Sequence, residues 1–172
     1  GDQPWSRGSG NTPSSSTGPS NGAYEGSYYI FTEASSQFNK QFLLDVVPTL
    51  STGNAYVLGF WYHMFGSGMG SLDVELGTLS AGVVSTASWT SLWTKTGEQQ
   101  DSAGDGWVHV VTPIVPAMDS VLRFHGVSGP DYMSDMCIDM VTIDVMQSNY
   151  VPGSFASGSG VCTPCNDFAS ES

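Results

Sequence analysis

The clearest indication of the fold of this 172-residue chain is FWYHMFGSGMGSLDVEL, residues 60–76, called here the deciding stretch. Its first part belongs to a long apolar run, AYVLGFWYHMF (55–65). Its last part belongs to SLDVELG (71–77), in which leucine and valine alternate with aspartate and glutamate. Such alternation is typical of a β-strand with one buried and one solvent-facing side. The glycines and serines between the two runs are typical of a loop, so the stretch predicts two consecutive strands.

Further runs rich in β-forming residues lie on both sides of this stretch, separated by Gly, Asn, Asp and Ser. Their spacing is that of a sandwich or a barrel. No segment shows a sustained helical period with capping residues. The sequence therefore predicts an all-β fold, an antiparallel β-sandwich of two packed sheets. The further predicted strands are SYYIFTE (27–33), QFLLDVV (41–47), SLWTKTG (91–97), WVHVVTPIV (107–115), SVLRFHGV (120–127) and CIDMVTIDVM (137–146).

The last predicted strand has apolar residues on both of its sides. Strict alternation predicts that one side carries Ile138, Met140 and Thr142. It predicts that the other side carries Cys137, Asp139, Val141 and Ile143. Because both sides are partly apolar, we expect this strand at the centre of a sheet.

The segments before and after the strands have a different composition. Residues 1–22 are dominated by Gly, Ser, Thr and Pro, and we expect an irregular segment in which Trp5 anchors a loop. After Met146 the stretch QSNYVPGSFASGSGV returns to linker chemistry. We therefore predict one domain over residues 1–148, a size that suits a single core. A Gly/Ser-rich linker and a cysteine-containing tail follow over residues 149–172.

The charge balance excludes some classes of partner. Sixteen acidic residues face four basic ones, which gives a formal net charge of -12. Binding of nucleic acid needs Lys and Arg to displace counterions from phosphates, so we predict no nucleic acid partner. The same charge disfavours anionic membrane surfaces, and the lack of a run of about 18 apolar residues predicts no direct membrane insertion. An acidic surface suits divalent cations, cationic partners or simple repulsion between molecules.

The residues give no pattern of a catalytic site. The three histidines, His63, His109 and His125, lie inside predicted strands, and no Gly-x-Ser-x-Gly motif is present. His63 belongs to the deciding stretch, where we expect a packed structural histidine. Sixteen acids form chance pairs too easily to indicate a glycosidase. We therefore predict that the chain is not an enzyme.

Three cysteines, Cys137, Cys162 and Cys165, allow at most one internal disulfide and leave one thiol over. The last two form a C-x-x-C motif, but no second pair and no nearby histidine completes a zinc site. Two disulfide arrangements are open: Cys137 pairs with one of the other two, or both of these reach outside the unit. Cys137 also alternates with core positions of its strand, where it would act as a small buried hydrophobe.

Five segments of the chain follow one another in an order that points to a family. They are DQPWSRGSGNTPSSSTGPS (2–20), GSYYIFTEAS (26–35), YVLGFWYHMFGSGMGSLDVEL (56–76), LWTKTGEQQDSAGDGWVHV (92–110) and SDMCIDMVTIDV (134–145). Together, and most specifically through the third segment, they resemble the MAM domain family, the adhesion module named after meprin, the A5 antigen and receptor tyrosine phosphatase mu. The resemblance implies a jelly-roll-like β-sandwich of secreted or cell-surface proteins. It also implies homophilic or heterophilic protein contacts and no catalysis.

The family's opening strand, with Asp-Phe-Glu and a nearby cysteine, should lie upstream of Asp2. A similar segment, CNDFASE, stands instead at residues 165–171. We therefore predict that Asp167 and Phe168 bind a partner, because the tail of one unit begins the sandwich of the next by strand addition. The partner is then the protein itself or a neighbouring repeat, and such a head-to-tail contact builds an open array or filament. The alternative is a tail without this role.

Calcium is the predicted cofactor, because hard cations take carboxylate and carbonyl oxygens from acidic, glycine-rich loops. By resemblance, jelly rolls of this kind hold a cation where an early loop meets the last strand. This implies Glu25 and Asp139 as metal ligands. Glu171 is a third candidate ligand if the tail completes a neighbour.

Carbohydrate binding is the alternative function. Trp89, Trp93 and Trp107 would form a stacking platform for a glycan, as in carbohydrate-binding sandwiches. Two of these tryptophans coincide with core positions of the family. We therefore favour core packing for them and an extracellular or cell-surface adhesion module for the whole chain.

Overall fold

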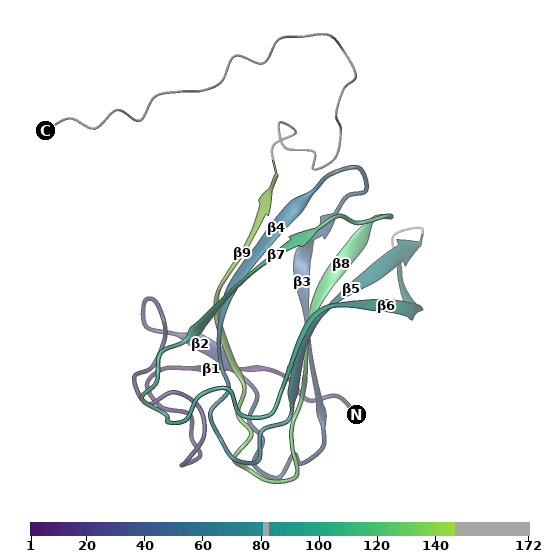
Figure 1. Ribbon diagram of the computed structural model, residues 1–172. Coiled ribbons are helices and arrows are strands. Elements are labelled where there is room, and N and C mark those ends of the chain that lie inside the picture. The colour runs from purple at the N-terminus through teal and green to yellow at the C-terminus, as the bar shows by residue number, and fades with distance from the viewer. Residues whose placement is uncertain (81–82, 147–172) are drawn as a thin grey trace, which may run out of the picture.

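The computed structural model describes residues 1–80 and 83–146. Within them, strands form two antiparallel sheets, and the predicted all-β, jelly-roll-like sandwich is confirmed (Figure 1). No helix in this part of the chain could cross a membrane. The strands are β1 (Ser6–Gly8), β2 (Tyr29–Phe31), β3 (Gln41–Leu50), β4 (Tyr56–His63), β5 (Ser71–Ser80), β6 (Val83–Thr96), β7 (Val108–Ile114), β8 (Ser120–Val127) and β9 (Cys137–Val145).

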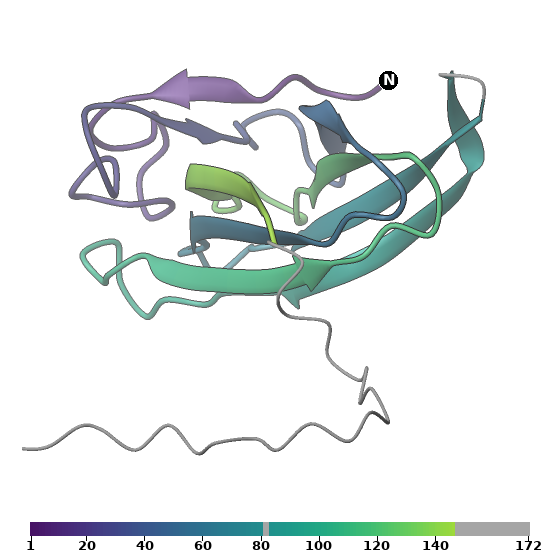
Figure 2. The same ribbon diagram turned by 90° about the horizontal axis from the view of Figure 1, so that it is seen from above.

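The order of the strands gives the sandwich its jelly-roll topology. One sheet has five strands in the order β1-β2-β9-β4-β7, and the other has four in the order β3-β8-β5-β6. Apart from the pairs β1–β2 and β5–β6, consecutive strands lie in opposite sheets. The chain therefore crosses between the sheets repeatedly. Figure 2 shows the long β5–β6 hairpin extending beyond the rest of its sheet.

The main core lies between the sheets and is built from alternate residues of their strands. Phe60 of β4 and Leu72 of β5, both from the deciding stretch, are completely buried in it. The Phe60 ring packs edge to face on Phe124 at 5.1 Å and on Trp93 at 5.2 Å between centroids. Such pairs stabilise a fold by about 0.5–1.5 kcal/mol beyond the burial of their area. The alternation seen in the sequence thus forms the core as predicted.

A second apolar cluster, called here the outer cluster, lies on the other side of the five-stranded sheet. It contains Tyr29, Phe31 and Cys137, and Trp107 packs against it. The indole N–H of Trp107 donates a hydrogen bond to the carbonyl oxygen of Gly22 at 3.2 Å, which ties the N-terminal loop to this cluster. Because both of its sides are covered here, the start of β9 is buried, as expected for a central strand.

β9 contains a bulge that the sequence does not reveal. Ile138 and Ile143 both lie opposite core residues of β4, although they are an odd number of residues apart. The register between β4 and β9 shifts between these two positions, and Met140 has a positive φ of 48°. A bulge inserts one residue and reverses the alternation beyond it. The predicted alternation over residues 137–143 is therefore wrong beyond Asp139.

Most predicted strands are confirmed with shifted ends. β8 has the predicted bounds, whereas β6 begins at Val83, well before the predicted 91–97. β1 was not predicted, because its three residues lie in a segment expected to be irregular. Trp5 packs against the main core, which confirms the anchored loop. The predicted domain boundary at 148 lies outside the described residues and stays a prediction.

Candidate strand-accepting site

One edge of β9 is largely unpaired in the described part of the chain. On one side, β4 pairs with β9 along almost its whole length. On the other side, β2 pairs only with Cys137 and Ile138. From Asp139 to Val145 no described strand lies beside this second edge, and Figure 1 shows this part of β9 at the margin of its sheet, beyond β1 and β2. We call this stretch the free edge of β9. Its backbone N–H and C=O groups can pair with an added strand.

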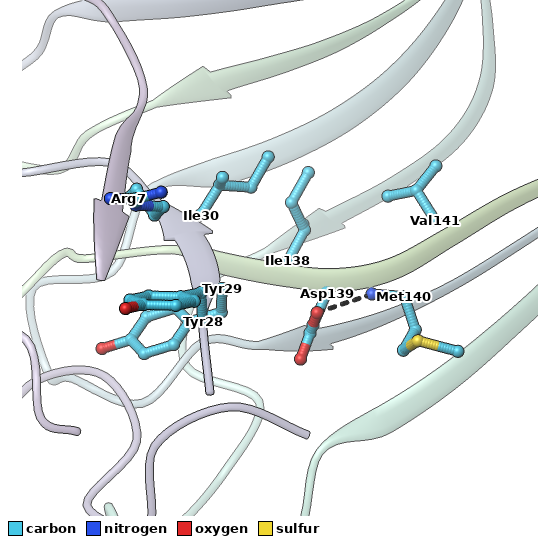
Figure 3. A pocket seen from close by; sticks show the side chains of 8 residues that line it. All are labelled: Arg7, Tyr28, Tyr29, Ile30, Ile138, Asp139, Met140 and Val141. Atoms are coloured by element: carbon cyan, nitrogen blue, oxygen red, sulfur yellow. Dashed lines mark hydrogen bonds between the residues drawn. The ribbon is translucent and has the colours of Figure 1, made fainter. Parts of the chain in front are cut away.

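Inward-facing side chains are exposed along this free edge. Val145 lies opposite Tyr56, a buried core residue, and yet Val145 is 59% exposed. Val141 is 36% exposed, and Figure 3 shows it on the same side of the sheet as the core residue Ile138. An inner-face valine is normally buried by the next strand of its sheet. The sandwich is therefore open along the side where this strand would lie.

The facing sheet is open on the same side. β3 is one of the two edge strands of the four-stranded sheet. Its inner-face residues Leu44 and Val46 pack against the main core but are only half-buried. In contrast Phe42, near the start of β3, is 1% exposed. An added strand on β9 would lie over these half-buried leucine and valine side chains.

A pocket of about 230 Å³ lies at the start of β2, where β9 continues without a paired strand (Figure 3). Ile138 and Val141 lie on one side of the β9 backbone there, and Asp139 and Met140 lie on the other. The Arg7 guanidinium stands 4.6 Å from the centroid of the Tyr28 ring, within the range of a cation–π contact. The lining residues are Arg7, Tyr28, Tyr29, Ile30, Ile138, Asp139, Met140 and Val141.

The carboxylate of Asp139 organises the bulge beside this pocket. Its Oδ2 atom accepts hydrogen bonds from the backbone N–H of Tyr24 at 2.8 Å and of Glu25 at 3.1 Å. Its Oδ1 atom accepts one from the N–H of Met140 at 2.8 Å. The structure thus brings the backbone N–H of one predicted ligand, Glu25, to the carboxylate of another, Asp139, while Glu171 lies outside the described residues. In the described part no group of three His, Cys, Asp or Glu residues could hold a metal ion, so calcium stays a prediction.

Cys137 behaves as a small buried hydrophobe. It is completely buried in the outer cluster, and burial raises the pKa of its thiol well above the ordinary value. The other predicted cysteines, Cys162 and Cys165, lie outside the described residues, and so do the predicted partner-binding residues Asp167 and Phe168. The disulfide and the role of the tail therefore stay predictions.

The tryptophan platform of the alternative function is not assembled, and Trp93 and Trp107 pack against apolar clusters as expected. Trp93 packs against the main core, Trp107 packs against the outer cluster, and Trp89 lies under the Arg123 guanidinium at 3.8 Å. A different aromatic group is present instead. The Trp61 ring stacks on Tyr24 at 3.7 Å and on His109 at 4.5 Å between centroids.

This aromatic stack could not be read from the sequence, because it depends on strand pairing. Trp61 and His109 are opposite residues in the β4–β7 register. The three histidines lie apart. His63 is buried near Trp107, and His109 is exposed. His125 lies on the four-stranded sheet, where its ring is hydrogen-bonded to Glu75 of the same sheet at 3.2 Å. The structure does not bring them into one group.

The chain matches the family model described as MAM domain, meprin/A5/mu, over residues 1–149. It is 33% identical to human MAM domain-containing glycosylphosphatidylinositol anchor protein 1 over 135 residues, which cover 76% of this chain and 13% of that protein. It is 30% identical to thyroid hormone-induced protein B of Xenopus laevis over 165 residues, which cover 95% of this chain and 20% of that protein. The chain thus spans a fifth or less of the length of these relatives.

Solved structures share the fold at low sequence identity. The K1 cleaved adhesin domain of Lys-gingipain from Porphyromonas gingivalis W83 has a TM-score of 0.55 and 17% identity, covering 82% of this chain and 83% of that chain. The Clostridium thermocellum xylanase 10B CBM22-1-GH10 modules, complexed with xylohexaose, have a TM-score of 0.54 and 13% identity, covering 87% of this chain and 26% of that chain.

Proposed function

Because the chain belongs to the MAM domain family, we propose that it is an adhesion module that binds protein partners by accepting a strand on the free edge of β9. Its location is extracellular or at the cell surface, as for its glycosylphosphatidylinositol-anchored relatives. The observation that carries the proposal is the exposure of Val141 and Val145 on the inner side of an unpaired strand edge. The proposal assigns no catalytic reaction to the chain.

Strand addition suits this edge for two physical reasons. An incoming strand pairs with backbone groups that are otherwise left to water, so main-chain hydrogen bonds give affinity. It also covers inner-face side chains of both sheets, and complete burial of one valine or leucine contributes about 1.5–3 kcal/mol. The half-buried Leu44 and Val46 belong to this surface together with the two exposed valines. Backbone pairing and apolar burial therefore act at the same place.

We propose further that the added strand is the segment 165–171 of another copy, so that the chain is a repeat unit of a self-assembling array. This segment, CNDFASE, looks like the opening strand of the family. A strand that passes from each unit to the next makes a head-to-tail contact, which grows into an open assembly. The partner in this proposal is therefore the protein itself or a neighbouring repeat.

Sedimentation tests this assignment. The full chain is compared with a chain that ends at residue 160, which keeps all of the described sandwich. We expect the full chain to form species that grow with concentration and the shortened chain to stay monomeric. Assembly that is equal in both would exclude the tail as the donor strand. Two monomeric proteins would exclude self-association through this edge.

Calcium binding belongs to the same proposal. Its ligands would be Glu25, Asp139 and the Glu171 of a neighbouring copy. The three backbone N–H groups that bind Asp139 already compensate its charge, so two carboxylates alone make a weak calcium site. We therefore expect calcium to matter only when a third carboxylate arrives with the added strand. Sedimentation in calcium and in chelator measures this dependence, and equal assembly in both would remove calcium from the proposal.

Glycan binding is the second candidate, favoured by the aromatic stack of Tyr24, Trp61 and His109. Tyr24 is 44% exposed, so part of its ring is open to a ligand. Xylohexaose, the ligand of the xylanase structure, is a suitable probe. If strand addition is the function, we expect no change in tryptophan fluorescence. A saturable change that Tyr24→Ala abolishes would establish glycan binding instead.

A further inference from the structure

The pocket at the start of β2 lies in line with an added strand. β2 pairs with β9 only at Ile138 and Cys137, and the pocket lies just beyond this pairing, beside Asp139. A strand placed on the free edge of β9 would therefore have its first or last residue at the pocket. A volume of about 230 Å³ is below the range of roughly 300–1,000 Å³ typical of small-molecule sites, so the pocket suits a single side chain.

The lining of the pocket selects the kind of side chain. Ile30, Ile138 and Val141 supply an apolar wall, and the Tyr28 ring adds an aromatic surface. This wall favours a large apolar side chain, above all an aromatic one. The charged groups in the lining are Arg7 and the Asp139 carboxylate, and the latter is already compensated by three N–H donors.

Arg7 supplies a positive charge to the pocket. It is exposed, and among the residues that the structure describes no carboxylate lies within 4.0 Å of its guanidinium. Arg123, by comparison, is bound to Asp45 at 2.6 Å. In a chain with sixteen acids and four bases, an available arginine beside an apolar pocket favours an apolar side chain that carries an acidic neighbour.

The tail contains one such pair. Phe168 is the single large apolar residue of the segment 165–172, and Asp167 precedes it. In an extended strand neighbouring side chains point to opposite sides, so Phe168 can enter the pocket while Asp167 stays near the rim. The linker contains a natural comparison: Ser154-Phe155-Ala156-Ser157 repeats the Phe-Ala-Ser of residues 168–170 without the acid.

We infer that this pocket selects the added strand by taking the Phe168 side chain of another copy, while Arg7 pairs with Asp167 beside it. The inference rests on the proposed self-association and names its acceptor residues. Pocket and charge together fix the register of the strand, because a shift by one residue would put an acidic or small side chain into the apolar pocket.

Two substitutions in the full chain test the inference, each with a matched control. Phe168→Ala removes the inserted ring, and Phe155→Ala removes the ring of the similar linker segment. Arg7→Glu reverses the charge at the pocket, and Lys95→Glu makes the same charge change on β6 of the other sheet. We expect the first member of each pair to weaken association by about tenfold or more, as for a central anchor residue, and the control to leave it unchanged.

A charge exchange tests the pairing itself. Asp167→Arg alone should weaken association as Arg7→Glu does, and the two changes in one chain should restore it, because each copy then presents a glutamate to an arginine. Failure of the double change to restore association would exclude the ion pair.

A cross-link tests the position. Met140→Cys places a thiol at the pocket. Cys165 precedes Phe168 by three residues, roughly 10 Å along an extended strand, so we expect a thiol-to-thiol cross-linker of about that length to join the new thiol to Cys165 of another copy. A denaturing gel detects the product as larger species that are lost on Cys165→Ser. Val111→Cys, on β7, is the control, since Val111 is also exposed at 61%. If assembly requires the tail but is unchanged by every substitution at the pocket, this inference is overturned and the proposed function stands. Absence of assembly in the full chain would overturn both.

Discussion

His63 and Asp135 are two ionisable side chains that the fold buries completely. Both ring nitrogens of His63 and the Oδ2 atom of Asp135 lack a hydrogen-bond partner in the described part of the chain. Burial lowers the pKa of His63 from 6.5 to about 4, and burial raises the pKa of Asp135 from 3.8 to about 6. The two residues act in opposite directions on acidification.

Whether acidification raises or lowers the free energy of unfolding depends on whether the folded or the unfolded chain binds the proton at the higher pH. Between about pH 6 and 4, folded Asp135 is protonated before the unfolded chain is, so this residue stabilises the fold as the pH falls. Over about pH 6.5 to 4 the unfolded chain protonates its histidine while folded His63 stays neutral, so stability is lost as the pH falls. The two contributions therefore largely cancel in the natural chain.

Two substitutions should separate these contributions. Relative to the natural chain, we expect Asp135→Asn to lose stability on going from pH 7 to 4.5, because the compensating group is gone. His63→Phe should gain stability over the same range. Urea unfolding at several pH values measures both differences. Identical pH profiles for the three proteins would show that these groups do not titrate differently in the folded state.

The elements of the fold differ in how far the sequence predicts them. β4, β5 and β8 are found where an apolar run or apolar alternation places them, because one face of each strand lies on the main core. β1 escapes prediction because three residues, Ser-Arg-Gly, carry no apolar pattern. The bulge in β9 escapes it too, since one added residue leaves the composition unchanged and alters only the direction in which the later side chains of the strand point. Alternation thus predicts strands but not their irregularities.

The glycine-rich turn between β4 and β5 packs closely against the backbone at the end of β8. A Cβ atom on Gly70 would overlap the carbonyl oxygen of Val127, whereas a Cβ on Gly106 would meet open space. We expect Gly70→Ala to lower the free energy of unfolding by several kcal/mol, since backbone rather than a flexible side chain would have to move. Gly106→Ala is the control and should stay within about 0.5 kcal/mol of the natural chain. Thermal or urea unfolding compares the two, and equal stabilities would refute the close contact.

The free edge of β9 can be blocked without disturbing the core. Val145 is 59% exposed, so Val145→Lys should leave the stability of the monomer nearly unchanged. An inward-pointing lysine on an edge strand opposes pairing with another chain, and assembly of the full chain should therefore be lost. Val111→Lys on β7 is the matched control, and its assembly should equal that of the natural chain. Equal assembly of both variants would place the contact elsewhere.

At the scale of the whole molecule, charge opposes self-association. Copies with a formal net charge of -12 repel one another at long range. The screening length falls from about 30 Å at 0.01 M salt to about 8 Å at 0.15 M, so we expect assembly to strengthen over this range. Sedimentation at increasing salt measures it. Weakening over the same range would mean that attraction between Arg7 and the tail outweighs the repulsion.

The candidate site joins parts of the chain that no local pattern connects. Arg7, Tyr28 and Asp139 meet only because β1, β2 and β9 are neighbours in one sheet. The sequence predicted Asp139 through a family resemblance, and it revealed the likeness of the tail to an opening strand. It could not identify the exposed inner-face valines, because exposure at a strand edge depends on which strands pair.

Because Cys137 is buried, the reactivity of its thiol reports how often the protein opens around it. An alkylating reagent such as iodoacetamide reacts with thiolates, and this thiol is both inaccessible and held protonated by the outer cluster. In a chain whose two tail cysteines are replaced by serine, the rate of labelling would therefore track the excursions that lift the N-terminal loop from the sheet. Occupation of the neighbouring edge by a donated strand would slow this labelling, and the labelled fraction measured by mass spectrometry would then report how seldom the assembled protein opens.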